Sequence, residues 1–135
     1  MSSSGAPDPG NDPPAPPRQA RLILLDDDPD VRSSIGDVLG SAGHQVAAYA
    51  SGEEVLADTN GHAGAAVLIA DIMLGGPLDG IAVAEALTAR IDGLKVIYIT
   101  GYFATARISG LRPQDRFLRK PFGIAELLNT VQELI

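Results

Sequence analysis

Short apolar runs alternate with stretches of helical spacing from Arg21 to the end of the chain. The first run, residues 22–25, is continuously apolar, which is typical of a strand buried on both faces. Asp28 and Pro29 then supply a helix N-cap and a first-turn proline, and apolar residues recur at helical spacing until Gly43. This pattern predicts a strand followed by a helix.

The same alternation continues along the chain, and it implies right-handed crossovers and a parallel sheet covered on both faces. We therefore expect an α/β fold of the flavodoxin-like (βα)5 type, a three-layer sandwich with strand order 2-1-3-4-5. The fourth helix is expected to be short or disordered, because Gly110 and Pro113 interrupt a weak apolar stripe. The predicted strands are 22–25, 45–50, 65–70, 96–99 and 117–118, and the predicted helices are 29–42, 52–56, 79–90 and 123–135.

The N-terminal segment differs from the rest. Residues 1–20 hold six Pro, two Gly and three Ser without apolar periodicity, which predicts a disordered Pro-rich arm. We interpret the arm as a spacer, with a groove ligand as the alternative. Residues 21–135 form the predicted domain and leave no space for a separate catalytic or DNA-binding module.

Composition narrows the function. The chain has no Cys, which excludes a disulfide framework, thiolate metal sites and a cysteine nucleophile, and its two histidines, His44 and His62, are expected to be exposed. The net charge of -7 argues against nucleic-acid binding. No apolar run reaches the roughly 18 residues of a membrane span, and no signal or lipidation pattern is present, so we expect no membrane contact and a cytoplasmic location. We expect a monomer or a weak dimer.

Unusual side chains follow four of the predicted strands. In chain order they are Asp26, Asp27 and Asp28, then Asp71, then Thr100, then Lys120. Because ligands of such sheets bind beyond the carboxyl ends of the strands, these side chains are expected to share one rim. Asp28 is explained by capping of the helix that follows. Asp26 and Asp27 need another explanation, because capping needs one carboxylate and not three.

The remaining side chains suit phosphoryl chemistry. Crowded carboxylates repel one another unless a cation bridges them, and oxygen ligands without His or Cys favour Mg²⁺. Mg²⁺ leaves coordination positions for phosphate oxygens, and a carboxylate beside it can act as a nucleophile and form an aspartyl-phosphate. Lys120 and Thr100 supply the cation and the hydroxyl that the phosphoryl oxygens need.

The strings LILLDDDPDVR, AVLIADIMLGGPLDG, VIYITGY and RFLRKPF resemble, in order, the four signature segments of the receiver domains of two-component response regulators. The resemblance covers nearly all of residues 21–135. It implies a stand-alone phosphoacceptor, and not an enzyme that turns over. Its phosphoryl group would come from a sensor histidine kinase or a histidine phosphotransferase in a Mg²⁺-dependent reaction, and its output would be a protein contact or onward phosphotransfer.

The resemblance also assigns roles to residues. Asp71 is the expected phosphoacceptor, and Asp26 and Asp27 are the expected acidic pair at the metal, with Asp27 as the direct ligand. The backbone carbonyl of Met73 is a further expected ligand. For the peptide bond before Pro121, the resemblance raises the frequency of the cis form above its base rate of ~5%.

Around the phosphoryl group, Thr100 is the expected hydroxyl donor and Lys120 the expected ion-pair partner. The resemblance places Phe117 at the expected aromatic switch position. Met73 and Tyr102 flank the phosphoryl group, and because neither side chain suits the holding of an attacking water, we expect a long-lived phosphorylated form.

The chain departs from the family pattern in two places. The loop after Asp71 has Gly75 where the common pattern has Pro, and one residue more before Asp79 and Gly80. The second departure is the segment between Thr100 and Lys120, which is about two residues shorter than the family norm. This short fourth-helix segment and the YITGY string resemble a subgroup of single-domain receivers of general stress-response signalling, with a FATGY-like motif.

Two other functions compete. A small haloacid-dehalogenase-like phosphatase would share Asp26, Asp28, Thr100 and Lys120, but position 30 is Asp where Thr or Val is expected. The other is an interaction module that never takes phosphate and docks an acidic partner on the basic residues after Thr100, and the retained phosphorylation-site residues count against it.

Overall fold

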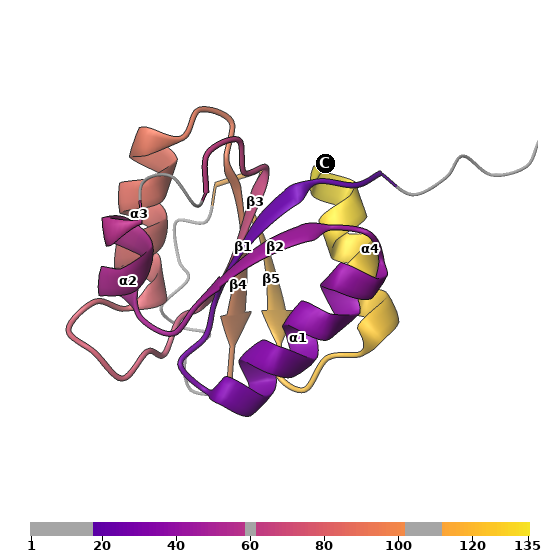
Figure 1. Ribbon diagram of the computed structural model, residues 1–135, viewed down its shortest axis with the longest axis horizontal. Coiled ribbons are helices and arrows are strands. Elements are labelled where there is room, and N and C mark those ends of the chain that lie inside the picture. The colour runs from indigo at the N-terminus through magenta and orange to yellow at the C-terminus, as the bar shows by residue number, and fades with distance from the viewer. Residues whose placement is uncertain (1–17, 59–61, 102–111) are drawn as a thin grey trace, which may run out of the picture.

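The computed structural model of the chain describes residues 18–58, 62–101 and 112–135. Its elements are β1 (Arg21–Leu25), α1 (Pro29–Ser41), β2 (Gln45–Tyr49), α2 (Gly52–Ala57), β3 (Val67–Asp71), α3 (Gly80–Arg90), β4 (Lys95–Thr100), β5 (Arg116–Arg119) and α4 (Ile124–Leu134). The strands form one parallel sheet in the order β2-β1-β3-β4-β5. Helices α1 and α4 cover one face, and α2 and α3 cover the other (Figure 1). The predicted flavodoxin-like fold is confirmed.

The alternation of side chains along β1 divides the hydrophobic core in two. Leu22 and Leu24 pack on one side of the sheet with Ile35 and Leu39 of α1. Leu25, one residue further along β1, belongs to the other core, beneath α2 and α3. All four leading positions of the apolar run are buried, as expected for a central parallel strand. Burial on both faces fixes where β1 ends and therefore where its acidic tail begins.

The predicted start of α1 is confirmed. The Asp28 side chain accepts hydrogen bonds from the backbone N–H groups of Asp30 at 2.9 Å and Val31 at 3.4 Å. Pro29 follows in the first turn, where its missing N–H does no harm. Gly43 has a φ of 95°, so it takes the left-handed conformation that lets the chain leave the helix.

Residues 18–20 contact the domain, although they were predicted to belong to the disordered arm. The Arg18 N–H donates to Gln132 Oε1 at 3.0 Å, and Gln132 Nε2 donates to the Arg18 carbonyl at 2.8 Å. These bonds tie the chain to α4 before β1 begins. Residues 1–17 lie outside the described residues, so the arm itself stays a prediction. The short or disordered fourth helix was expected in residues 103–115, before β5. Residues 102–111 of that segment lie outside the described residues, and residues 112–115 contain no helix, so the expectation stays a prediction.

The prediction that both histidines are exposed is wrong. His44 is 6% exposed and His62 is 5% exposed. The Ala20 N–H donates to His44 Nδ1 at 3.1 Å, and His62 Nε2 lies 3.0 Å from the Val55 carbonyl. Each imidazole therefore has a hydrogen-bond partner in the backbone of a distant segment. The flanking glycines of the sequence, which suggested exposed loops, do not reveal such a partner.

Among the described residues, no helix combines the length and the apolar character needed to cross a membrane.

Candidate functional site

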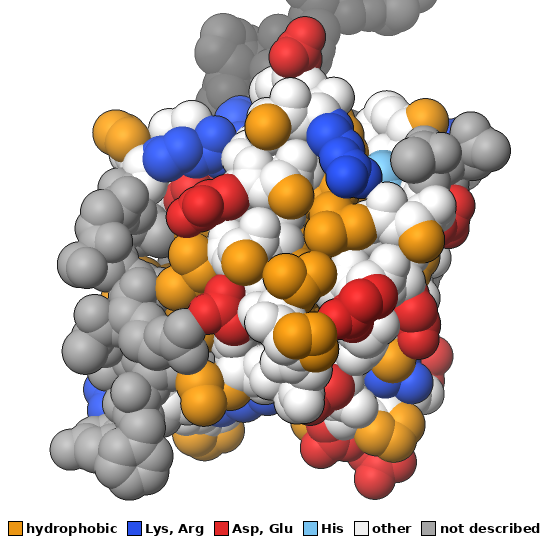
Figure 2. All heavy atoms as spheres, turned by 90° about the vertical axis from the view of Figure 1, so that its left-hand side faces the viewer, with side chains coloured by type: hydrophobic (Ala, Val, Ile, Leu, Met, Phe, Trp, Pro, Cys, Tyr) orange, Lys and Arg blue, Asp and Glu red, His pale blue; other side chains and the backbone are white. Residues whose placement is uncertain are grey.

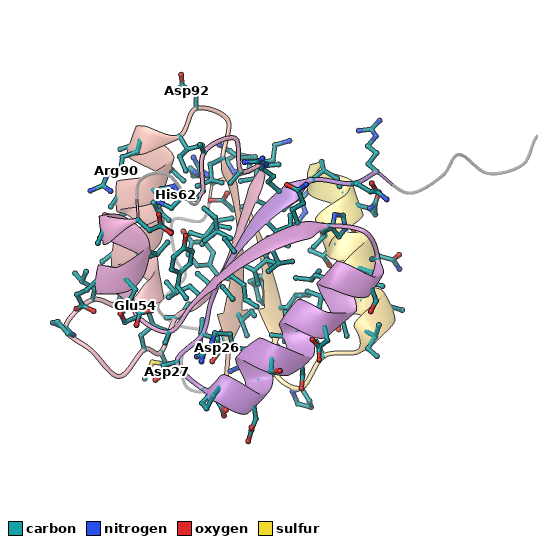
Figure 3. The ribbon with its side chains drawn as sticks, viewed as in Figure 1. Asp26, Asp27, Glu54, His62, Arg90 and Asp92 are labelled. Atoms are coloured by element: carbon teal, nitrogen blue, oxygen red, sulfur yellow. The ribbon has the colours of Figure 1, made fainter. Side chains whose placement is uncertain are left out.

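The expected rim exists. Because β1, β3, β4 and β5 are parallel, their carboxyl ends lie at one end of the sheet. Asp71 and Thr100 are the last residues of β3 and β4, and Lys120 follows β5 directly. Figure 3 shows Asp26 and Asp27 at this same end, below β1, far from His62. Seen from the side of α2 and α3, acidic side chains gather toward this lower edge (Figure 2).

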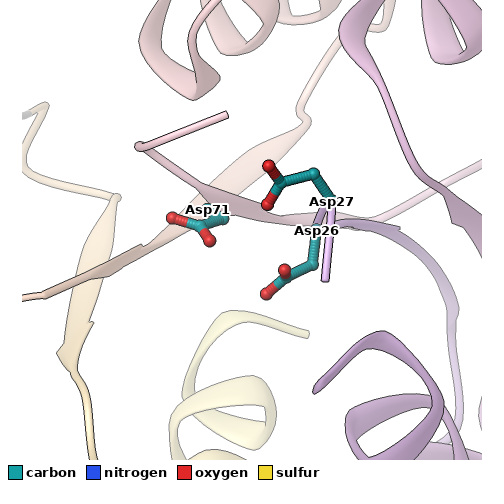
Figure 4. A group of neighbouring side chains, drawn as sticks. All are labelled: Asp26, Asp27 and Asp71. Carbon is teal, nitrogen blue, oxygen red and sulfur yellow. The ribbon is translucent and has the colours of Figure 1, made fainter. Parts of the chain in front are cut away.

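Three carboxylates form the centre of the site. One oxygen from each of Asp26, Asp27 and Asp71 lies within 4.8 Å of the others. Figure 4 shows the three groups converging on a common space, with Asp26 and Asp27 from the end of β1 and Asp71 from the end of β3. Asp26 and Asp71 are buried, whereas Asp27 is exposed. The structure thus brings together the acidic residues that the sequence singled out.

Asp26 is the most deeply placed carboxylate. It is 0% exposed, and its Oδ1 accepts a hydrogen bond from the Asp28 N–H at 2.9 Å. Its Oδ2 is buried without a hydrogen-bond partner among the described residues and lies 3.6 Å from Lys120 Nζ. Burial is the main cause that raises the pKa of Asp26, and the charges of Asp71 and Asp27 raise it further. The hydrogen bond from the Asp28 N–H and the charge of Lys120 lower this pKa but do not outweigh the rise.

Asp71 is held at both oxygens. Its Oδ1 accepts a hydrogen bond from the Met73 N–H at 3.0 Å, and its Oδ2 accepts one from Lys120 Nζ at 3.1 Å. Burial lowers the pKa of Lys120, but the hydrogen bond and charge of Asp71 together with the charge of Asp26 outweigh it, so the net direction is upward. Lys120 therefore stays an ammonium ion between two buried carboxylates.

Thr100 and Lys120 are joined through the backbone. The Lys120 N–H donates to the Thr100 carbonyl at 2.8 Å. Thr100 is 0% exposed, and its Oγ1 donates to the Gly101 carbonyl at 2.9 Å. The Lys120–Pro121 peptide bond is cis. Both residues thus stand at the rim where the sequence placed them.

The structure describes the surrounding residues in part. Met73 is 54% exposed beside the acidic centre, and Phe117 is 47% exposed on β5. Tyr102 lies outside the described residues. The carbonyl of Met73 as a metal ligand and the roles of Phe117 and Tyr102 therefore stay predictions.

Sequence reasoning missed two glycines at the site. The Gly75 N–H donates to Asp27 Oδ2 at 3.0 Å. Gly80 lies so close to the backbone of Asp71 and Ile72 that a Cβ would overlap the Asp71 carbonyl. The Gly-Gly-Pro run of the loop and the Asp-Gly pair before α3 were the available signals, but the sequence marks them only as a departure from the family's loop pattern and gives them no role at the site.

Among the described residues, three of the basic side chains after Thr100 make ion pairs within the domain. Arg112 Nη2 lies 2.8 Å from Asp115 Oδ1, and Arg116 Nε lies 3.2 Å from Glu133 Oε1. With Lys120 facing Asp71, three of these bases are engaged by acids of this chain. The surface they leave for an acidic partner is correspondingly reduced.

The donor set fits a hard divalent cation. The three carboxylates supply oxygen ligands only, and the unpartnered, buried Oδ2 of Asp26 is an atom that a cation would satisfy. Lys120 compensates part of the negative charge and leaves a net negative site. Such a site can bind a metal and a phosphoryl group side by side.

Comparisons with known proteins agree with this geometry. A family model described as the response regulator receiver domain matches residues 22–132. The chain is 29% identical over 117 residues to the protein named response regulator receiver protein CpdR of Brucella abortus, covering 85% of this chain and 96% of that protein. It is 33% identical over 118 residues to the response regulator MprA of Mycobacterium sp. (strain KMS), and there it spans 50% of the relative's length.

Solved structures give the same result. A response regulator receiver protein from Sinorhizobium medicae superposes with a TM-score of 0.77 at 28% identity, covering 86% of this chain and 94% of that chain. A Francisella receiver domain superposes with a TM-score of 0.70 at 28% identity, covering 85% and 95%. Together with the family match over most of its length, these likenesses show that the chain belongs to the response regulator receiver domain family of two-component systems.

Proposed function

We propose that this receiver domain accepts a phosphoryl group on Asp71 from a sensor histidine kinase or a histidine phosphotransferase. The observation that carries the proposal is the setting of Asp71, whose carboxylate lies beside the charged Lys120 and within 4.8 Å of ligand atoms of Asp26 and Asp27. A nucleophilic carboxylate, a cation and a pair of metal-binding acids are the parts that phosphoryl transfer needs.

The reaction exchanges one bond for another. An oxygen of the Asp71 carboxylate attacks the phosphorus of a phosphohistidine, and a P–O bond forms as the P–N bond breaks. The electron pair of that bond returns to the imidazole, which leaves with a proton from its surroundings. No further reactant is needed, because the donor brings the phosphoryl group.

Asp26, Asp27, Asp71 and the Met73 carbonyl are the proposed ligands of Mg²⁺. When bound, Mg²⁺ neutralises the negative charge that gathers between the nucleophile and the phosphoryl oxygens. Lys120 already lies against Asp71 and supplies a second positive charge there. Thr100 supplies a hydroxyl for a phosphoryl oxygen once it gives up its bond to the Gly101 carbonyl.

The output is proposed to be a protein contact or onward phosphotransfer. Phosphorylation changes the charge that Lys120 and Thr100 face. Thr100 ends β4, and Lys120 follows β5, the strand that carries the exposed Phe117. We propose a cytoplasmic protein, monomeric or weakly dimeric, that does not bind nucleic acid and that loses its phosphate only slowly without a partner.

The test is intact-mass measurement after incubation with a small-molecule phosphodonor and Mg²⁺. The wild-type chain is expected to gain one phosphoryl group, and Asp71→Asn to gain none. A gain in both proteins, or in neither, overturns the proposal.

Two further assays, phosphate release from a phosphate monoester and partner binding, separate the alternatives. A phosphatase releases inorganic phosphate from a phosphate monoester over many turnovers, whereas a phosphoacceptor releases at most one equivalent. A module that works without phosphate gains no mass and binds its partner equally well as wild type and as Asp71→Asn.

A further inference from the structure

The three carboxylates of the site are not equally restrained. Asp26 is buried, and Asp71 is fixed by the Met73 N–H and by Lys120. Asp27 is exposed, so the repulsion of its two acidic neighbours favours rotation of its side chain away into solvent. Something must hold this carboxylate in the cluster before a cation arrives.

The loop between β3 and α3 does this through a backbone group. The Gly75 N–H donates to Asp27 Oδ2 at 3.0 Å, across 48 residues of sequence. Among the described residues the Asp27 carboxylate accepts no other hydrogen bond. It uses one carboxylate oxygen and leaves Oδ1 for a cation.

The glycine itself is part of the fit. A Cβ at Gly75 would stand 3.2 Å from Asp27 Oδ2, which is tighter than an ordinary contact. The φ angle of Gly75 is not positive, since the described glycines with positive φ are Gly43, Gly64 and Gly93. Gly75 is therefore favoured by close approach to Asp27 and not by a left-handed backbone.

We infer that Gly75 is a positioning residue whose N–H holds Asp27 in the orientation needed to bind Mg²⁺. The inference rests on the proposed function, because it assigns a supporting group to the same metal site. It links the length and composition of the loop to metal affinity. An Asp27 side chain that is already oriented binds Mg²⁺ more tightly, because no free energy is spent on moving its carboxylate toward its acidic neighbours.

The experiment is a Mg²⁺ titration of the full chain followed by ¹H–¹⁵N NMR, which needs no phosphorylation. Gly75→Pro removes the N–H and is expected to weaken Mg²⁺ binding by about 5-fold, the scale of one hydrogen bond between exposed groups. Gly75→Ala keeps the N–H and is expected to stay within about 2-fold of wild type after a small adjustment of the 3.2 Å contact. Urea unfolding in metal-free buffer establishes that each variant is folded.

Two further readouts act as controls. Gly76→Ala changes the neighbouring position, where a Cβ meets only the Glu53 carboxylate at 3.7 Å, and is expected to leave Mg²⁺ affinity unchanged. In metal-free wild type the Gly75 amide is expected to exchange slowly with solvent, and in Asp27→Ala it is expected to exchange faster.

The outcomes decide between the two levels of inference. Equal Mg²⁺ affinity of Gly75→Pro and wild type, or equal losses in Gly75→Pro and Gly75→Ala, overturns the role of the N–H while the proposed function stands. If Mg²⁺ binding depends on the Gly75 N–H but the chain never gains a phosphoryl group, the proposed function is overturned and the role of Gly75 stands. A wild-type chain without Mg²⁺ affinity refutes both.

Discussion

Lys120 Nζ lies 3.1 Å from Asp71 Oδ2 and 3.6 Å from Asp26 Oδ2, so one ammonium group pairs with two buried carboxylates. In metal-free protein this cation is therefore the main compensation for their charge. Loss of the Lys120 charge should lower the stability of the metal-free protein, and Mg²⁺ bound between the same carboxylates should partly restore it.

Lys120→Met is expected to lower the free energy of unfolding in metal-free buffer at neutral pH by about 2 kcal/mol, because it leaves two buried carboxylates without their cation. Addition of Mg²⁺ is expected to stabilise this variant more than wild type. Urea denaturation with and without Mg²⁺ measures both effects. Lys95→Met is the matched control, since Lys95 Nζ donates at 3.1 Å to the uncharged Leu134 carbonyl. Equal losses in the two variants would contradict a role for charge compensation.

Asp26→Asn is expected to stabilise the metal-free protein by about 1 kcal/mol at pH 7, because it removes a buried charge whose pKa is raised mainly by burial. The native state holds the Asp26 proton to higher pH than the unfolded state does. The Asp26 contribution to stability therefore falls as the pH rises from its ordinary pKa of 3.8 through the raised value.

Urea denaturation between pH 4 and pH 7 in the presence of a chelator checks this sign. The stability advantage of Asp26→Asn over wild type should grow toward pH 7. Asp27→Asn, which alters an exposed carboxylate, is the comparison and should gain less. An Asp26→Asn variant that is less stable than wild type at pH 7 would show that the carboxylate is already compensated.

The sheet order and the rim were predictable because each depends on local patterns. The apolar run of β1 has to be buried on both faces, and Asp28 has to cap α1. Once the strands are parallel, the aspartates after β1 and β3, Thr100 and Lys120 must lie at the same end of the sheet.

The missed features depend on contacts between distant segments. His44 is buried where its Nδ1 accepts a hydrogen bond from the Ala20 N–H of the neighbouring segment. The Gly75 bond to Asp27 joins two loops, and the sequence pattern of neither loop specifies the other. Such partners follow from the assembled fold and not from periodicity.

Gly80→Ala is expected to lower the free energy of unfolding by about 2 kcal/mol, because its Cβ would overlap the Asp71 carbonyl and approach Ile72 Cα at 3.0 Å. The first turn of α3 would have to move away from the strand end that carries Asp71, so slower phosphorylation is also expected. Gly40→Ala in α1 is the control, since nothing lies within 4 Å of its Cβ, and it should stabilise by about 0.5 kcal/mol. Unfolding and mass measurements that rank the two variants alike would show that the close approach at Gly80 is easily relieved.

The lifetime of the phosphorylated form is expected to depend on Met73. Its backbone N–H donates to Asp71 Oδ1 at 3.0 Å, and Met73 is 54% exposed beside this carboxylate. Hydrolysis needs a water held in line with the P–O bond, and a thioether is a poor group for holding one. Tyr102, which flanks the site by sequence, is expected to exclude that water as well.

Met73→Asn combined with Tyr102→Glu is therefore expected to speed the loss of phosphate about 10-fold, which corresponds to about 1.4 kcal/mol of barrier. Intact mass followed over time after removal of the phosphodonor measures the rate. Met73→Leu keeps an apolar side chain and should leave the lifetime unchanged, which separates water orientation from a mere change of packing. If the double variant decays no faster than wild type, or if Met73→Leu decays as fast as the double variant, the water is controlled by other groups of the site.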